Sequence, residues 1–443
     1  MISRKEKHQA NRQRSKQRRK KELMRIFIPI LFLAVIGGGA ALMMNLDSND
    51  EKDMALPSKG GYESSVEDEP PAASPDDAVN DTGNEGRAPA DGTEDEAKGT
   101  EDREEPSEDA DPEKVPDRGE PTGSGGSSVS ISFVGDVMFS GKVEPIMEEY
   151  GYDYPYSRLG DSLSCADITV ANLETPISLR GEPIEEKEWV YRSSPDALPA
   201  LAEAGVDLVN LANNHILDYG WDAFYDTFDY LNESGIEYVG AGKNEAEAYQ
   251  YKVIEQNGIK VAFLGFSRVV PEGSWKAGPE KPGVAETYDY TRPVQAIEKA
   301  EKEADVVVVL THWGDERSDL PNEIQSELSH RYIDAGADLV VGGHPHVLQG
   351  FEPYEGKWIA YSLGNFIFTT NTVEKTWETV ILNAECSKTG DCSLSVQPIL
   401  TKFALPTPME PDAAKQLLER LSSISIGAEV DEQGDVRLKE EQP

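Results

Sequence analysis

Cysteine and histidine are scarce in this sequence. Three cysteines and six histidines occur among 443 residues, which argues against a cysteine-rich zinc site. There is no Gly-x-Ser-x-Gly elbow, so a serine hydrolase finds no support. A complete phosphate-binding loop is also absent, because Gly240-Ala241-Gly242-Lys243 is only a fragment of that pattern and is more typical of a turn.

Charged residues are absent between Ile26 and Met44, directly after a strongly basic segment. Residues 1–25 hold 11 basic side chains against two acidic ones. A helix rises about 1.5 Å per residue, so the uncharged run can cross a hydrocarbon core about 30 Å thick. Because basic flanks stay on the cytoplasmic side, we predict a cytoplasmic arm (1–25) and a transmembrane signal anchor (26–46). The chain would be single-pass in the cell membrane, with its C-terminal domain extracellular.

Two alternatives exist for this region. The small residues Gly37 to Ala41 could mark the processing region of a cleaved signal peptide, although both flanking segments are long for one. Basic clusters can also contact nucleic acid, but membrane topology explains them better directly before an apolar run. A lipoprotein anchor is excluded because no cysteine follows the apolar segment.

Apolar residues are few between Asp47 and Ser128. This segment has 26 acidic residues against 7 basic ones, and Tyr62 is its only aromatic residue. Such a composition cannot bury enough apolar surface to offset the entropy of ordering the chain. We therefore predict a disordered acidic stalk over residues 47–128.

The remaining residues, 129–443, are predicted to form the extracellular domain. Their net charge is −30, and the arm (+9) and the stalk (−19) account for the rest of the total of −40. This acidity argues against nucleic acid as a partner. It would also repel polyanions unless metals or local basic residues compensate.

The three cysteines all lie in this domain. Cys386 and Cys392 bracket a turn-like sequence between two strand-like runs, so a disulfide closing the hairpin is plausible in an oxidising exterior. Cys165 is predicted to be a small core residue.

Short β-rich runs alternate with helical patterns in the domain, which indicates an α/β fold with a largely parallel sheet covered on both faces. After Trp358 the pattern changes to strands alone, which suits a second sheet, so we predict an α-β-β-α sandwich. The expected strands are 129–134, 167–171, 206–211, 259–266, 305–310, 337–341, 358–363, 378–383 and 393–400.

Polar side chains follow five of these strands at the point where each strand ends. Four of the six histidines occur there: His215, His312, His344 and His346. Ligands bind beyond the carboxyl ends of strands in open α/β sheets, so these clusters are expected to converge on one crevice. Carboxylate, amide and imidazole together form a ligand set for Mn, Zn or Fe.

Taken singly, each of these signals has another interpretation. The His-Pro-His sequence could be a satisfied loop pair, and Asn213-Asn214-His215 could be a simple turn. Asp136 could cap a helix. Gly342 and Gly343 are expected to let the backbone turn tightly, and Pro345 to fix it, so that His344 and His346 point into one site.

Six motifs resemble, as an ordered set, those of the CapA proteins of poly-γ-glutamate capsule synthesis, a branch of the calcineurin-like metallophosphoesterase superfamily. The resemblance spans Ser130 to about Leu405. The motifs are Val-Gly-Asp-Val-Met (134–138), Ala-Asn-Leu-Glu-Thr-Pro (171–176), Leu-Ala-Asn-Asn-His-Ile-Leu-Asp-Tyr-Gly (211–220), Thr-His-Trp-Gly (311–314), Gly-Gly-His-Pro-His-Val (342–347) and Ser-Leu-Gly-Asn-Phe (362–366).

The resemblance implies a site for one or two divalent metal ions. His215 resembles the superfamily's catalytic histidine, and Asp218 would orient it. The implied ligands are Asp136 and His346 for the first metal, Glu174 as the bridging carboxylate, and Asn214, His312 and His344 for the second metal.

Two departures from the superfamily pattern weaken the first metal site. Met138 occupies a position where the superfamily usually has a histidine, and Glu174 occupies a position where it usually has an aspartate. Asn172, Glu316 and Asn365 lie in the same motifs and could supply a missing ligand.

The resemblance implies a role in making, exporting or anchoring poly-γ-glutamate at the cell surface. Two hypotheses follow: a metal-dependent hydrolase or transferase, or a non-catalytic accessory subunit that binds the polymer or a membrane-bound synthase. Met138 favours the second, and the Asn214-His215 pair favours the first.

Overall fold

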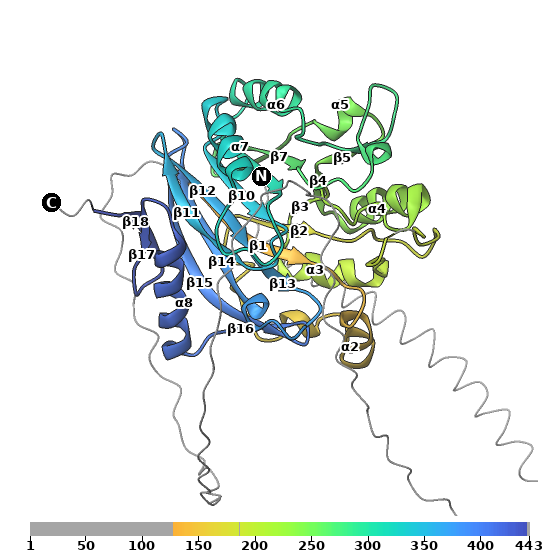
Figure 1. Ribbon diagram of the computed structural model, residues 1–443, viewed down its shortest axis with the longest axis horizontal. Coiled ribbons are helices and arrows are strands. Elements are labelled where there is room, and N and C mark those ends of the chain that lie inside the picture. Colours follow the sequence, from red (N-terminus) through yellow and green to blue (C-terminus); the bar gives the residue numbers. More distant parts are fainter. Residues whose placement is uncertain (1–126, 186, 441–443) are drawn as a thin grey trace, which may run out of the picture. The chain divides into compact units, whose positions relative to one another are not determined.

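The computed structural model describes residues 127–185 and 187–440. The predicted arm, the predicted membrane span and nearly all of the predicted stalk lie outside the described residues. Within the described part, no helix has both the length and the apolar character needed to cross a bilayer. The predicted α/β class is confirmed, since helices and strands alternate along this part of the chain (Figure 1).

Two β-sheets form the centre of the fold, one with ten strands and one with six. The ten-stranded sheet contains β1 (Ser128–Val137), β2 (Ile168–Leu173), β3 (Leu208–Asn210), β4 (Glu237–Val239), β13 (Asn365–Ile367), β14 (Glu378–Ser387), β15 (Cys392–Lys402), β16 (Leu405–Pro408), β17 (Ala428–Val430) and β18 (Asp435–Leu438). The six-stranded sheet contains β6 (Lys252–Gln256), β7 (Ile259–Ser267), β9 (Val306–His312), β10 (Leu339–Gly343), β11 (Leu348–Tyr354) and β12 (Lys357–Leu363).

Most of the helices cover the outer faces of the sheets, whereas the helix at 411–424 packs Leu417, Leu418 and Leu421 into the core cluster between the sheets. Leu201 and Phe224 belong to a core cluster with strands of the ten-stranded sheet, whereas Ile297 and Leu328 belong to one with strands of the six-stranded sheet. The helices are α2 (Val143–Tyr150), α3 (Leu198–Ala204), α4 (Gly220–Ser234), α5 (Glu245–Ala248), α6 (Thr291–Glu301), α7 (Glu323–Asp334) and α8 (Pro411–Ile424), and a short sheet pairs β5 (Ala241–Gly242) with β8 (Gly283–Val284).

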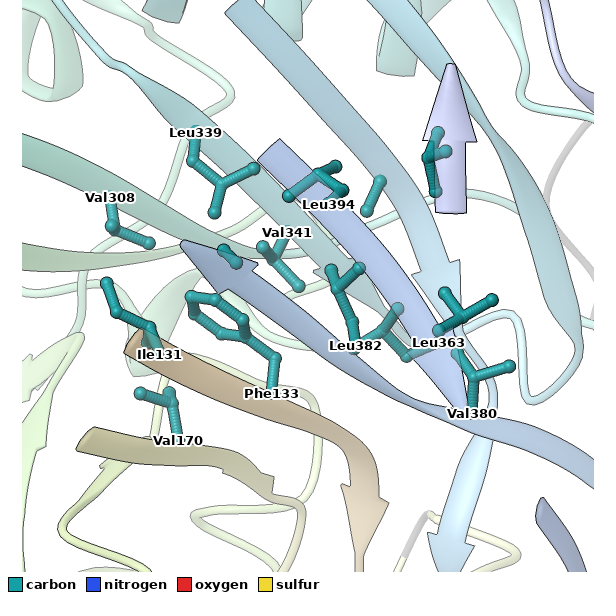
Figure 2. Packing of buried hydrophobic residues seen from close by; sticks show 14 of the residues in the cluster. Ile131, Phe133, Val170, Val308, Leu339, Val341, Leu363, Val380, Leu382 and Leu394 are labelled. Carbon is teal, nitrogen blue, oxygen red and sulfur yellow. The ribbon is translucent and has the colours of Figure 1, made fainter. Parts of the chain in front are cut away.

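The inner faces of the two sheets pack against each other. Figure 2 shows Phe133 and Leu382 of the larger sheet in one cluster with Val308 and Val341 of the smaller sheet. Side chains alternate between the two faces of a strand, so Val308 faces this inner core while its neighbour Val309 faces the helices. The continuous apolar run in β9 is therefore explained by burial on both faces.

The predicted division of strands between the sheets was wrong. The strands expected to form one parallel sheet are split, with β1, β2 and β3 in the larger sheet and β7, β9 and β10 in the smaller one. The strands after Trp358 do not make a sheet of their own, because β12 pairs in parallel with β10 and β14 pairs antiparallel with β1. Periodicity identifies a strand but does not specify its partner.

The predictions for the cysteines had different outcomes. Cys386 and Cys392 are opposite each other on β14 and β15 and form the disulfide that the sequence made plausible. Cys165 is exposed, and the prediction that it is a core residue was wrong. It lies in the turn before β2, where Leu163 and Ala166 are the buried side chains.

Candidate metal centre

The polar strand ends of both sheets meet at one place. Asp136 lies near the end of β1, Glu174 follows β2, and Asn214 and His215 follow β3. From the smaller sheet, His312 ends β9. His344 and His346 follow β10, which pairs in parallel with β9. These residues are far apart in the sequence, but the distances between their side chains place them in one site.

Glu174 lies at the centre of the site. Its side chain is fully buried, and neither carboxylate oxygen has a hydrogen-bond partner among the described residues. Its Oε1 lies 3.6 Å from Nε2 of His312 and 3.8 Å from Nε2 of His346. Burial, and then the nearby Asp136 carboxylate, raises the pKa of Glu174 well above its usual value. A buried carboxylate without hydrogen bonds is costly unless a cation compensates it.

Two groups of candidate ligands share Glu174. The first group is Asp136, Glu174 and His346, and the second is Glu174, His312 and His344. Within each group the ligand atoms lie within 4.8 Å of one another, which is close to twice the distance of about 2.0–2.2 Å between a divalent cation and its ligand atoms. Nδ1 of His344 is also buried without a hydrogen-bond partner among the described residues. These orphaned donor atoms fit a divalent metal ion.

Two asparagines lie beside the second group. Asn214 Oδ1 is 2.9 Å from Nε2 of His312, so it can complete the same ligand set. Asn172 is placed differently: its Nδ2 donates to Asp136 Oδ1 at 2.8 Å and lies 3.2 Å from Nδ1 of His312. Its amide oxygen accepts from Asn210 instead. Asn172 therefore orients two candidate ligands rather than presenting an oxygen to the site.

The other suggested substitute ligands have different surroundings. Asn365 Oδ1 lies 2.9 Å from Nδ1 of His346, where it can hold the imidazole ring in place. The Glu316 side chain is exposed, and its charge acts on Glu174 and His346 from outside the buried cluster. Met138 is fully buried and offers no strong ligand to the first group.

His215 forms a buried cluster with Asp218 and Lys187. Nδ1 of His215 lies 2.6 Å from Asp218 Oδ2, and Nε2 lies 4.0 Å from Glu174 Oε1. Because the carboxylate accepts at Nδ1, Nε2 is the nitrogen free to move a proton at the site. Burial lowers the pKa of His215, and the Asp218 hydrogen bond only partly opposes it.

Lys187 is a residue of the site that sequence reasoning missed. Its ammonium group donates to Asp218 Oδ1 and to the carbonyl oxygen of Asn214, both at 2.5 Å, and lies 3.0 Å from Nδ1 of His215. Burial lowers the pKa of Lys187, against the effect of Asp218. In the sequence it is one lysine in the acidic run Glu185–Glu188, with no motif around it that could have indicated its role.

The His-Pro-His turn corrects the prediction for Gly342 and Gly343. The backbone strain falls on the histidines themselves, since φ is +95° at His344 and +56° at His346. The glycines are needed for space: a Cβ on Gly342 would lie 2.1 Å from the carbonyl oxygen of Tyr361, and one on Gly343 would lie 2.6 Å from Asp136 Oδ1.

The pKa values of the three candidate histidine ligands are shifted in different directions. Burial lowers the pKa of His312 and His344 well below the usual value, and neighbouring histidines add to this effect. Burial acts in the same direction on His346, but the carboxylates of Glu174 and Asp136 outweigh it and raise the pKa of His346 to about 10. Nδ1 of His346 lies 3.3 Å from Asp136 Oδ2, which is consistent with an ion pair.

The protein therefore has an α/β fold with a candidate centre for divalent metal ions, formed by buried carboxylates and imidazoles at the strand ends. The chain belongs to the family described as bacterial capsule synthesis protein PGA_cap, whose model matches residues 130–370. The predicted family resemblance is thereby confirmed.

Curated relatives support the same assignment. The chain is 34% identical over 291 residues to the "PGA biosynthesis protein CapA" of Bacillus subtilis (strain 168), covering 65% of this chain and 76% of that protein. It is 32% identical over 322 residues to the "Capsule biosynthesis protein CapA" of Bacillus anthracis, covering 70% and 78%. A "Probable polyglutamine synthesis accessory protein" of Mycobacterium tuberculosis (strain ATCC 25618 / H37Rv) is 35% identical over 216 residues, covering 46% and 56%.

Solved structures resemble the chain only weakly. A hypothetical protein from Thermus thermophilus gives a TM-score of 0.35 at 17% identity and covers 63% of this chain and 96% of its own. A 5'-nucleotidase from Candida albicans SC5314 gives 0.33 at 13% identity, covering 62% and 52%.

Proposed function

We propose that this chain acts in the synthesis, export or anchoring of poly-γ-glutamate at the cell surface, as a metal-dependent hydrolase or transferase of metallophosphoesterase type. Family membership and the names of the two Bacillus relatives support the biological role. The metal-dependent chemistry is supported most directly by the position of Glu174, which belongs to both groups of candidate ligands. Its carboxylate is buried, and neither oxygen has a hydrogen-bond partner among the described residues.

The residues of the site fall into two sets, one that would bind the cations and one that would transfer a proton. Asp136, Glu174 and His346 would hold one cation, while Asn214, His312 and His344 would hold a second with Glu174. Divalent cations in such a site supply Lewis acidity that polarises a carbonyl or phosphoryl group and activates water. His215 would move a proton at Nε2, with Asp218 fixing the imidazole through Nδ1.

The proposal includes a membrane anchor. The basic arm at 1–25 and the uncharged run that follows support a single-pass topology with the catalytic domain outside the cell. The acidic segment at 47–128 would then separate the domain from the membrane, near a membrane-bound synthase.

A second candidate function is a non-catalytic accessory subunit that binds the polymer or the synthase. Met138 favours it, because a methionine supplies no imidazole to the first ligand group, which therefore has only three candidate ligands among the described residues. The mycobacterial relative, named as a probable accessory protein, also supports this alternative.

Metal content separates these candidates. We would measure the metal-to-protein ratio of the purified full chain by elemental mass spectrometry after incubation with Mn, Zn or Fe. About two metals per chain is the expected result for the enzyme, and one metal would favour the accessory role. No bound metal under any of these conditions would contradict the metal-dependent proposal.

Substitution of His215 tests the catalytic role directly. His215→Ala should lower turnover of phosphoester or γ-glutamyl amide substrates about 10²- to 10⁴-fold, because it removes the proton-transfer group, and should leave metal content unchanged. His330→Ala is the matched control, since His330 lies on α7 and pairs with Glu352. Full activity in His215→Ala would remove His215 from the mechanism.

A further inference from the structure

Arg268 lies at the same strand edge as the candidate metal ligands. Ser267, the last residue of β7, is opposite His312 in the sheet, and His312 is opposite Gly343. The backbone N–H of Arg268 donates to the carbonyl oxygen of His312 at 2.8 Å. Neighbouring strands are about 4.8 Å apart, so the Arg268 backbone borders the metal centre on the side of the second ligand group.

Tyr288 holds two cationic side chains at this edge. The guanidinium carbon of Arg268 and the ammonium nitrogen of Lys276 each lie 3.9 Å from the centroid of its ring, and therefore no more than twice that distance apart. Tyr288 is 44% exposed, so solutes can reach the cluster. Stacking on the ring fixes both long side chains and reduces the entropy lost when they bind a ligand.

The positive charge of this cluster is only partly neutralised. Arg268 has no carboxylate partner among the described residues, and Lys276 lies 3.9 Å from Glu286. Glu286 Oε2 also accepts from the backbone N–H groups of Tyr288 and Asp289. Glu286 therefore compensates Lys276 only in part, and the remaining positive charge of the cluster favours an anionic ligand.

The cluster continues toward the catalytic residues. Lys187, which donates to Asp218, also lies 5.5 Å from the centroid of the Trp275 ring. Trp275 is the residue directly before Lys276 and is buried. The residue before Lys276 therefore lies beside Lys187, and the Arg268 backbone lies beside His312, so positive charge gathers at this end of a domain whose net charge is strongly negative.

We propose that Arg268, Lys276 and Tyr288 form a carboxylate-binding subsite that positions the polymer beside the metal centre. This inference rests on the proposed function. A γ-linked glutamate chain carries a free carboxylate on each residue, and a guanidinium group can bind a carboxylate through two parallel hydrogen bonds. The subsite would hold one such carboxylate while a neighbouring linkage lies at the centre. It also accounts for how a strongly acidic domain accepts a polyanion.

Binding of short γ-linked oligoglutamate to the full chain tests the subsite. We would measure it by fluorescence anisotropy for the parent, for Arg268→Gln/Lys276→Gln and for Lys299→Gln. Lys299 is the matched control, because its ammonium group also lies over a tyrosine ring, that of Tyr251. It lies near the end of α6, which leads into the start of β9, whereas the candidate metal centre is at the other end of that strand. The double substitution should weaken binding about tenfold, as expected for two partly buried ion pairs, and the control by less than about twofold.

A local readout excludes effects of folding and of the basic arm. In the parent chain, the oligomer should protect Lys276, but not Lys299, from chemical acetylation followed by mass spectrometry. Equal binding by parent and double variant, or no protection of Lys276, would overturn the subsite while leaving the proposed function intact.

Binding of polyphosphate, a different polyanion, tests whether the proposed function itself is wrong. If the parent binds polyphosphate through Arg268 and Lys276 but does not bind the γ-linked oligomer, both the assigned polymer and the carboxylate subsite are wrong. Weaker binding of an α-linked oligoglutamate of equal charge would support recognition of the γ-linkage.

Discussion

The two ligand groups of the candidate centre share Glu174 but differ in their surroundings. In the second group, Glu174, His312 and His344 are all buried, and Asn214 Oδ1 lies 2.9 Å from His312 as a fourth candidate ligand. In the first group, His346 is only partly buried, and the fully buried Met138 supplies no strong ligand. The second group therefore has more ligands and less access to water, so we expect it to bind a cation more tightly than the first.

Substitution of the shared residue should have the largest effect. Glu174→Gln removes a ligand from both groups at once, so metal affinity at each should fall more than about 100-fold, beyond the loss typical of an outer-shell change. Elemental mass spectrometry of the dialysed full chain gives the readout. Glu352→Gln is the control, because Glu352 pairs with His330 away from the centre. Retention of one tightly held metal in Glu174→Gln would show that the groups do not share this residue.

The comparison predicts a different outcome for the two single histidine substitutions. His346→Ala should remove the metal that a chelator extracts first and leave the more slowly extracted metal in place. His344→Ala should do the reverse and lower the tightly bound fraction by about one metal per chain. Timed chelation with a colorimetric indicator distinguishes the two fractions. Identical extraction curves for the two variants would refute the inequality of the groups.

Removal of a supporting amide should have the smallest effect. Asn365 contacts His346, whereas Asn172 contacts both Asp136 and His312. Asn365→Ala should therefore weaken only the first group, by about tenfold, while Asn172→Ala should weaken both. Metal titration of the two variants provides the measurement. Loss of the tightly bound metal in Asn365→Ala would mean that the two groups are coupled through more than Glu174.

The convergence of the strand ends could be predicted from the sequence because it depends on local pattern. Buried strands are recognisable in runs such as Val306–Leu310, and the polar residue after each run lies at the carboxyl edge whichever sheet the strand joins. The distribution of strands between the sheets could not be predicted, since β12 and β14 have similar patterns but pair with different sheets. Which strands pair is decided by tertiary packing.

The roles of single residues were less predictable than their location. Lys187 contacts Asp218 from a loop with no recognisable motif, so only the fold brings it to the site. Asn172 lies in a motif that suggests a substitute ligand, but its orientation is set by Asn210, a neighbour on another strand. The turn at His344 could be anticipated, but not that the histidines rather than the glycines adopt positive φ.

The position of β1 in the larger sheet has a mechanical consequence. Its amino end at Ser128 is where the described domain continues into the preceding chain, and β1 lies between β14 and β2 in the interior of the sheet. Hydrogen bonds between strands run across the strand direction, so tension applied through the preceding residues would load many of them together in shear. Asp136 lies at the far end of β1. A force applied through the residues before Ser128 would therefore be borne by the sheet before it distorts the candidate metal centre.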